Sequence, residues 1–150
     1  SSNHALYDTE RGVNKILYSD TTAAEATAAD SLTAFNSNGF TLGADSAYGR
    51  VNYNGTNQVA WSFKKKAKFF DIVTYTGTGV TDRTVSHNLG ISPGMVIVKR
   101  TNSTESWLIL HRSEPSNNYF LNLTITASGQ QTLFSLSVRI TIQMLLERTL

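Results

Sequence analysis

The sequence predicts an all-β protein built as an antiparallel β-sandwich. Apolar and polar residues alternate with period two in several short runs, as at Val59, Trp61 and Phe63, and turn-forming pairs such as Asn54-Gly55 separate these runs. Charged residues make up only 16% of the chain, against about 25% in an average domain, and Thr, Ser, Asn and Ala replace them. A sheet with one apolar face needs a second layer to cover it, so we expect two facing sheets.

The first half of the chain predicts short strands joined by turns. Residues 4–8 and 13–18 form apolar runs around a polar turn, and the Ala-rich stretch 21–30 is compatible with either a helical turn or a loop. Residues 31–63 contain further alternating runs. The turns at 36–39 and 54–55 carry Asn and Gly, which supply the positive φ that tight hairpins need.

The second half predicts a further set of strands. The unbroken apolar run 95–99 indicates a central strand covered on both faces, because such runs are typical of doubly buried strands. Residues 84–87 look like an edge strand. Other strands are expected at 70–75, 107–110 and 119–123. Trp61 and Trp107 lie inside alternating runs and are therefore expected in the core.

A weak internal repeat suggests how the chain is divided. The pattern of residues 4–8 recurs at 107–111, which corresponds to a unit of roughly a hundred residues, a common module size. The interpretation is that 1–66 form the later part of a first β-sandwich module and that 67–150 form most of a second. The opening hairpins of the first module would then lie upstream of Ser1.

The tail at 137–150 departs from the repeat, and two explanations stay open. The first is an amphipathic end in which Ile140, Ile142, Leu145 and Leu146 pack against the fold. The second is a slipped reading frame, because codons for this stretch can encode an Asn- and Gly-rich turn like the one at 51–55. The nucleotide sequence distinguishes the two.

Composition excludes several classes of protein. The chain has no cysteine, which excludes disulfides and thiolate metal sites, and its net charge of +2 gives no reason to expect a nucleic-acid partner. There is no long apolar run or leader-like start, so we expect neither membrane insertion nor a signal peptide. The basic run at 64–68 has no interleaved aromatic residue and is expected to be a solvated linker or strand end.

Motifs for catalysis or metal binding are missing. Ser86 and His87 are neighbours on a strand and so face opposite sides, which prevents a direct nucleophile–base pair. The histidines lack metal-ligand spacing. The acids that could serve a glycosidase lie in turn or Ala-rich sequence, where solvated acids are common: Asp8, Glu10 and Glu25. We therefore expect a protein without enzymatic activity, cofactor or metal.

One loop has the composition of a sugar-binding site. Sugar recognition combines an aromatic face with planar amides, and Tyr48, Asn52, Tyr53 and Asn54 supply both within a few residues. The alternative is an ordinary hairpin loop in which a tyrosine covers the sheet edge.

A string of motifs resembles a repeated module of large tail-fibre or virion-surface proteins of marine phages. The motifs are YDTERG at 7–12, AFNSNGFTLG at 34–43, VNYNG and QVAWSF within 51–63, FDIVTYTGTG at 70–79, and HNLGISPGMVIVKR at 87–100. The resemblance covers about residues 3–127. It implies a jelly-roll or concanavalin A-like β-sandwich, a virion-surface or extracellular setting, and contact with a glycan or receptor.

These observations lead to an expected function with two alternatives. We expect a non-enzymatic module that presents loops to a host-surface glycan, pairs with neighbouring modules of the same fibre and forms homo-oligomers, because exposed sheet edges need cover. The first alternative is a purely structural spacer without a ligand. The second is a carbohydrate-active enzyme on a lectin-like sandwich.

Overall fold

The protein is an all-β chain with antiparallel pairing throughout the part that is described. The structure is a computed structural model that describes residues 3–46, 51–113, 119–122, 129–130 and 139–144. Within these residues every regular element is a β-strand, and every strand pair is antiparallel. The predicted fold class is confirmed.

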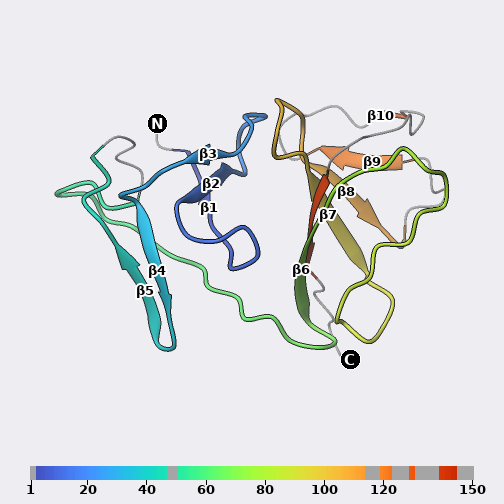
Figure 1. The fold of residues 1–150 in the computed structure, drawn as a ribbon, viewed down its shortest axis with the longest axis horizontal. Helices are drawn as coiled ribbons and strands as arrows, with labels where there is room; N and C mark the ends of the chain where they lie inside the picture. Colours follow the sequence, from blue (N-terminus) through green and yellow to red (C-terminus); the bar gives the residue numbers. More distant parts are fainter. Residues whose placement is uncertain (1–2, 47–50, 114–118, 123–128, 131–138, 145–150) are drawn as a thin grey trace.

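The strands form three sheets (Figure 1). A three-stranded sheet has the order β1-β2-β3, from strands Ala5–Leu6, Lys15–Tyr18 and Ala26–Thr27. Strands β4 (Leu32–Asn36) and β5 (Gly39–Leu42) make a two-stranded hairpin. The third sheet has six strands in the order β10-β9-β8-β7-β11-β6. Its strands are β6 (Phe70–Tyr75), β7 (Met95–Lys99), β8 (Leu108–His111), β9 (Tyr119–Asn122), β10 (Gly129–Gln130) and β11 (Arg139–Met144).

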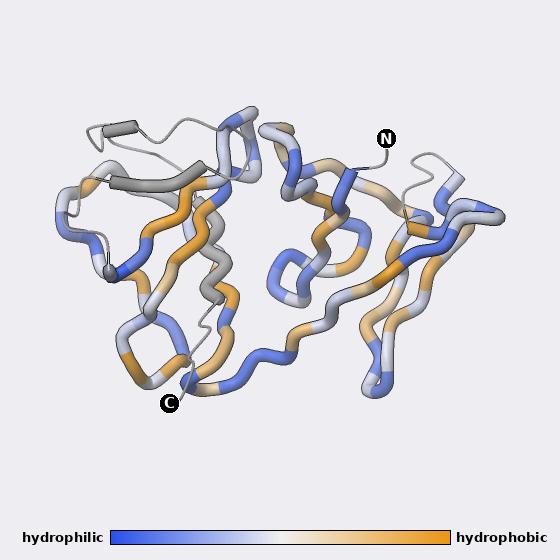
Figure 2. The backbone as a smooth tube through the Cα atoms, turned by 180° about the vertical axis from the view of Figure 1, so that it is seen from behind, coloured by the Kyte–Doolittle hydropathy of each residue, from blue (hydrophilic) through white to orange (hydrophobic). Residues whose placement is uncertain are grey.

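Strand β2 joins two hydrophobic clusters because both of its faces are covered. Leu17 packs with Ile97 of β7 and with Trp107, just before β8. Ile16 and Tyr18 point to the other face, where they pack with Ala28. Successive strand side chains alternate between faces, so one short strand can serve both clusters. The three-stranded sheet thereby packs on the six-stranded sheet as an incomplete β-sandwich, and Figure 2 shows hydrophobic segments in both parts.

Two loops reinforce this packing through backbone hydrogen bonds. Glu25 N–H donates to Thr101 O at 2.8 Å, and Glu105 N–H donates to Thr22 O at 2.9 Å. The loop between β2 and β3 is therefore fixed to the loop between β7 and β8. The proposed division at residue 66 stays a prediction, as does the jelly-roll connectivity.

The strongest strand prediction is confirmed, and the tail has an unexpected place. Strand β7 lies between β8 and β11, as its apolar run indicated. Strand β11, from the atypical tail, pairs on one side with β6 and on the other with β7, so that Ile142 is opposite both Ile72 and Ile97. Leu145 and Leu146 lie outside the described residues, and the slipped reading frame stays a hypothesis.

Residues 21–30, for which a helical turn and a loop were both expected alternatives, are mainly loop and contain the two-residue strand β3. Three local predictions are wrong. Residues 59–63 and 84–87 form no strand. The turn between β4 and β5 does not use positive φ. Among the described non-glycine residues, positive φ occurs at Asn14, Asp45, Lys68 and Asp82.

The two tryptophans have opposite environments. Trp107 is 1% exposed, as predicted, whereas Trp61 is 81% exposed. An alternating sequence becomes a buried strand only where a sheet edge and a second layer receive it. Among the described residues, the run around Trp61 joins no sheet, and Phe63 at its end packs on Phe70 of β6 with ring centroids 5.7 Å apart.

Candidate functional site

The predicted sugar-binding loop follows β5 and leaves an aromatic ring in solvent. Asn52, Tyr53 and Asn54 are all exposed, and the exposed fraction of Tyr53 is 62%. Tyr48, the fourth predicted residue, lies outside the described residues. The three described residues are close because they are consecutive.

A buried carboxylate, that of Asp45, holds the backbone of residues 51 and 52 in this loop. Asp45 is 2% exposed and accepts hydrogen bonds from the Ser31 hydroxyl, from Val51 N–H at 2.7 Å and from Asn52 N–H at 3.2 Å. Three donors satisfy the buried charge, which would otherwise be costly to remove from water. The carboxylate therefore connects Ser31, the residue just before β4, to the loop that contains Tyr53.

The loop is tied down further by its own backbone. The Asn52 side-chain amide donates to Gly43 O at 2.6 Å, so this predicted ligand-binding group already makes a structural contact. The carbonyl of Tyr53 accepts the Thr56 hydroxyl at 2.8 Å, and Gly55 adopts a φ of 74° that favours glycine. Tyr53 thus presents a ring on a fixed backbone.

Sequence reasoning missed the group beneath the loop. The pKa of Tyr7 is raised to about 12, chiefly because burial disfavours the phenolate and further because Asp45 is negative, while the Ser31 hydroxyl opposes the shift. Tyr7, Ser31 and Asp45 come from three separate segments, and only the tertiary fold brings them together.

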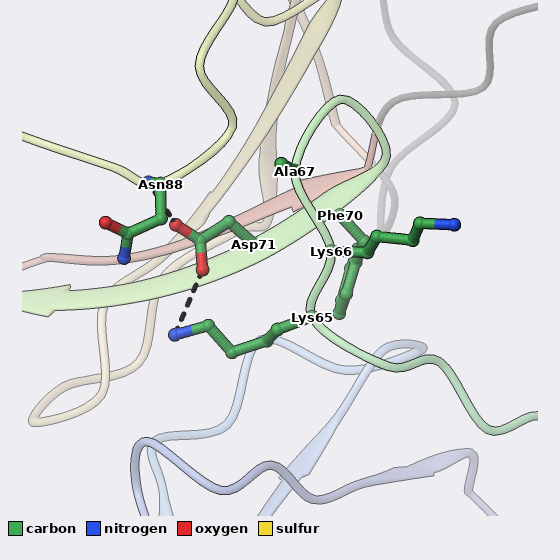
Figure 3. A pocket seen from close by; sticks show the side chains of 6 residues that line it. All are labelled: Lys65, Lys66, Ala67, Phe70, Asp71 and Asn88. Atoms are coloured by element: carbon green, nitrogen blue, oxygen red, sulfur yellow. Dashed lines mark hydrogen bonds and ion pairs between the residues drawn. The ribbon is translucent and has the colours of Figure 1, made fainter.

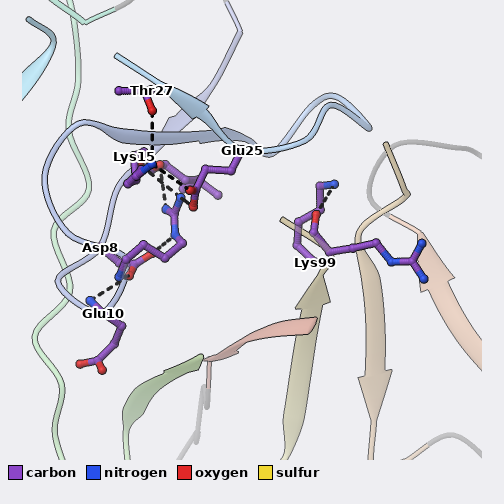
Figure 4. A network of polar contacts seen from close by, with 9 residues as sticks. Asp8, Glu10, Lys15, Glu25, Thr27 and Lys99 are labelled. Atoms are coloured by element: carbon purple, nitrogen blue, oxygen red, sulfur yellow. Dashed lines mark hydrogen bonds and ion pairs between the residues drawn. The ribbon is translucent and has the colours of Figure 1, made fainter. Parts of the chain in front are cut away.

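The acids considered for glycoside hydrolysis have structural partners, and Figure 4 shows those of Asp8 and Glu25. The side chain of Asp8 is 4% exposed, accepts Arg11 N–H at 2.8 Å and forms an ion pair with the Arg11 guanidinium. That guanidinium also reaches Glu25 Oε2 at 3.3 Å, while Glu10 Oε1 lies 2.8 Å from Lys65 Nζ. These contacts hold the β1–β2 turn in place.

A further ion pair borders a cavity of about 130 Å³ at the start of β6 (Figure 3). Lys65 Nζ lies 3.0 Å from Asp71 Oδ1, and Asp71 Oδ2 accepts Asn88 N–H at 2.7 Å. Burial alone would raise the pKa of Asp71, but the Asn88 hydrogen bond and Lys65 together lower it. The hydrogen bonds to Glu10 and Asp71 raise the pKa of Lys65.

The basic run at 64–68 behaves as a strand end. Lys66 forms an isolated antiparallel bridge with Phe70, and the Lys65 ammonium forms ion pairs with Glu10 and Asp71. The bridge agrees with the strand-end alternative, but Lys65 is held in ion pairs and is not simply solvated. The cavity beside these residues contains both charges of the Lys65–Asp71 ion pair.

Lys99 is a buried cation that the sequence did not single out. It is 0% exposed at the end of β7, and its Nζ donates to Thr22 O at 3.2 Å and to Arg100 O at 2.9 Å (Figure 4). Desolvation lowers its pKa, with Glu105 opposing the shift. The ammonium fastens the two loops that join the sheets and has no access to a ligand.

Two histidines accept hydrogen bonds from the backbone two residues further along the chain, and one of them, His111, is the last residue of β8. His87 Nδ1 accepts Leu89 N–H at 3.2 Å, and His111 Nδ1 accepts Ser113 N–H at 3.3 Å. Within the described residues no group of three potential ligands could hold a metal ion. In the same part of the chain, no helix has the length and hydropathy to cross a membrane.

Comparison with known proteins identifies a family of undefined activity. The family model described as domain of unknown function DUF7483 matches residues 1–145. The chain belongs to this family. No curated protein and no solved structure matches it significantly. The match includes β11 and so extends well into the atypical tail.

Proposed function

We propose that the chain is a non-enzymatic binding module of a virion-surface or tail-fibre protein, and that it contacts a host-surface glycan through Tyr53 and Asn54. The observation that carries this proposal is the 62% exposed ring of Tyr53 on a loop fixed by the buried Asp45 carboxylate. A rigid loop loses little conformational entropy when a ligand binds, which favours affinity.

The chemistry of this loop suits a sugar. The face of a tyrosine ring is a flat apolar surface for the C–H groups of a pyranose, while its hydroxyl and the neighbouring Asn54 amide offer donors and acceptors to sugar hydroxyls. Aromatic and polar groups side by side are typical of sites that bind small polar ligands.

The acids of the chain favour binding over hydrolysis. A glycosidase needs two carboxyl groups placed on either side of the scissile bond. Asp8, Glu10 and Glu25 all form ion pairs with basic side chains of the same chain, and Asp8 is almost fully buried. This use of the acids supports a binding role.

A glycan array tests the proposal with the wild-type chain, Tyr53→Ala and Tyr53→Phe. We expect the wild type to bind one class of glycan and Tyr53→Ala to bind at least about tenfold more weakly, which corresponds to a loss of about 1.4 kcal/mol. Tyr53→Phe keeps the ring and should retain most of the affinity.

Phe35→Ala is a matched control because Phe35 is an exposed aromatic residue on the β4–β5 hairpin, with 38% of its surface accessible. It should bind as the wild type does. A folded wild-type chain that binds no glycan would reject the proposal in favour of the structural spacer.

A further inference from the structure

Residues 57–65 form an extended segment with three exposed apolar side chains. The exposed fractions are 79% for Val59, 81% for Trp61 and 47% for Phe63. Within the described part of the chain, no backbone group of residues 57–64 hydrogen-bonds to another backbone group. Side chains of this kind, in strict alternation, are typical of a strand that has a partner.

The outer edge of β6, the strand that follows this segment in sequence, is already occupied where the segment reaches it. Phe70 at the start of β6 already exchanges both backbone hydrogen bonds with Lys66, at 2.9 and 3.0 Å. Two residues further on, Ile72 N–H donates to Asp71 Oδ1 at 3.0 Å and Ile72 O accepts Lys65 Nζ at 3.3 Å. Residues i and i+2 of a strand direct their backbone groups to the same side, so these side chains occupy the outer edge of β6. The Lys65–Asp71 ion pair therefore prevents the Lys66–Phe70 bridge from growing into a longer hairpin.

We propose that residues 57–65 pair with the same residues of a second copy of this chain. The two segments would run antiparallel about a twofold axis at Trp61. Val59 of one copy would then lie opposite Phe63 of the other, and the two Trp61 side chains would face each other. Alternation places all of these apolar side chains on one face of the new ribbon.

The charges of the segment select the antiparallel arrangement. In this register Lys64 lies opposite Gln58, Lys65 opposite Asn57 and Lys66 opposite Thr56, so each lysine meets an uncharged polar residue. A parallel, in-register pair would place each lysine opposite its own copy, and like charges directly opposite are destabilising. Isologous twofold contacts are also the commonest form of self-association.

The size of the contact predicts a weak dimer. Two aromatic side chains and one valine from each copy would meet on one open face of the ribbon, where each is only partly covered, and Phe63 already packs on Phe70. The area buried is therefore expected to lie below the roughly 1,200 Å² of a standard specific interface. We expect a dimer that dissociates on dilution. This association does not involve Tyr53 and is independent of glycan binding.

The first test is the molar mass of the full chain by sedimentation velocity over a range of concentrations. The wild type should shift from monomer to dimer as concentration rises, and Trp61→Glu should stay monomeric. Val80→Glu is the matched control because Val80 is an exposed apolar residue, with 69% of its surface accessible, outside the segment. It should dimerise as the wild type does.

The second test fixes the register. The chain has no cysteine, so any disulfide in a single-cysteine variant must involve the introduced position. Position 60 of one copy should lie opposite position 62 of the other, within the distance that a disulfide spans. A mixture of Ala60→Cys and Ser62→Cys chains should oxidise to the mixed dimer faster than a mixture of Ala60→Cys and Val80→Cys.

Two results would overturn the proposal. One is a wild type that is monomeric at every concentration. The other is a dimer that Trp61→Glu leaves intact or that cross-links Ala60→Cys to Val80→Cys as readily as to Ser62→Cys.

Discussion

The indole Nε1 of Trp107 donates a hydrogen bond to the carbonyl oxygen of Tyr18 at 2.9 Å, across 89 residues of sequence. The same N–H also reaches Thr21 O at 3.2 Å. The ring lies in the cluster with Leu17 and Ile97. The Trp107 side chain thus provides apolar packing and also donates hydrogen bonds to two backbone carbonyls where the two sheets meet.

Replacing Trp107 should loosen this junction. Trp107→Phe keeps most of the apolar surface but removes the N–H that donates to the carbonyls of Tyr18 and Thr21, so we expect a loss of about 1–3 kcal/mol in the free energy of unfolding. Trp107→Ala should cost about 3–5 kcal/mol because it also leaves a cavity. Urea unfolding measures both. Equal stability of the wild type and Trp107→Phe would show that these hydrogen bonds do not stabilise the fold.

Gly43 is required by a close approach of two backbones. A Cβ atom at this position would lie 2.3 Å from the carbonyl oxygen of Asp30. Gly43→Ala should therefore destabilise the chain by at least about 1–3 kcal/mol, since the backbone has to shift. Gly39→Ala is the control because its added Cβ meets no atom within 4 Å. Thermal unfolding in which both variants behave alike would contradict the close approach.

The Asp71 carboxylate should make the free energy of unfolding decrease at acidic pH. Its pKa is lower in the folded chain than in the unfolded chain. The folded state therefore binds fewer protons, and the stability that Asp71 contributes is complete above the unfolded pKa of about 3.9 and lost as pH falls through the folded value. Asp71→Asn should reduce stability by about 1–3 kcal/mol at neutral pH and flatten the decline below about pH 4.

Urea midpoints measured from neutral to acidic pH check this prediction. Glu10→Gln is the comparison, because Glu10 also pairs with Lys65 but is far more exposed than Asp71. It should lower the urea midpoint at neutral pH less than Asp71→Asn does, because exposed ion pairs contribute little to stability. An unchanged slope in Asp71→Asn would assign the acid sensitivity to other groups.

Strands were predictable where the sequence has an unbroken apolar run or where a short turn joins two strands. The apolar run Met95–Lys99 encodes β7 and its central position, and turn residues encode the β4–β5 hairpin. The exposed loop at Tyr53 was also predictable, because Asn and Gly locate the turn and the aromatic residue is adjacent.

The remaining features depend on contacts between distant segments. In the sequence, Asp45 looks like an ordinary solvated acid of a turn, and only the structure shows that it accepts a hydrogen bond from the distant Ser31. Lys99 resembles a strand-end lysine, yet it is buried by the loop that contains Thr22. The alternation around Trp61 is real, but the side chains of Lys65 and Asp71 close the edge that would receive it. Periodicity describes a strand without showing whether an edge is open.

Acrylamide quenching of the two tryptophans, measured in Trp61→Phe and Trp107→Phe, tests the account most directly. Its central claim is that Trp107 lies in a core shared by both sheets while Trp61 stays available for contact with another molecule. Emission from Trp107 should be blue-shifted and resist quenching at every concentration. Emission from Trp61 should be readily quenched in dilute solution and become protected as concentration rises. A Trp107 that is quenched as easily as Trp61, or a Trp61 that is already protected in the dilute monomer, would contradict the account.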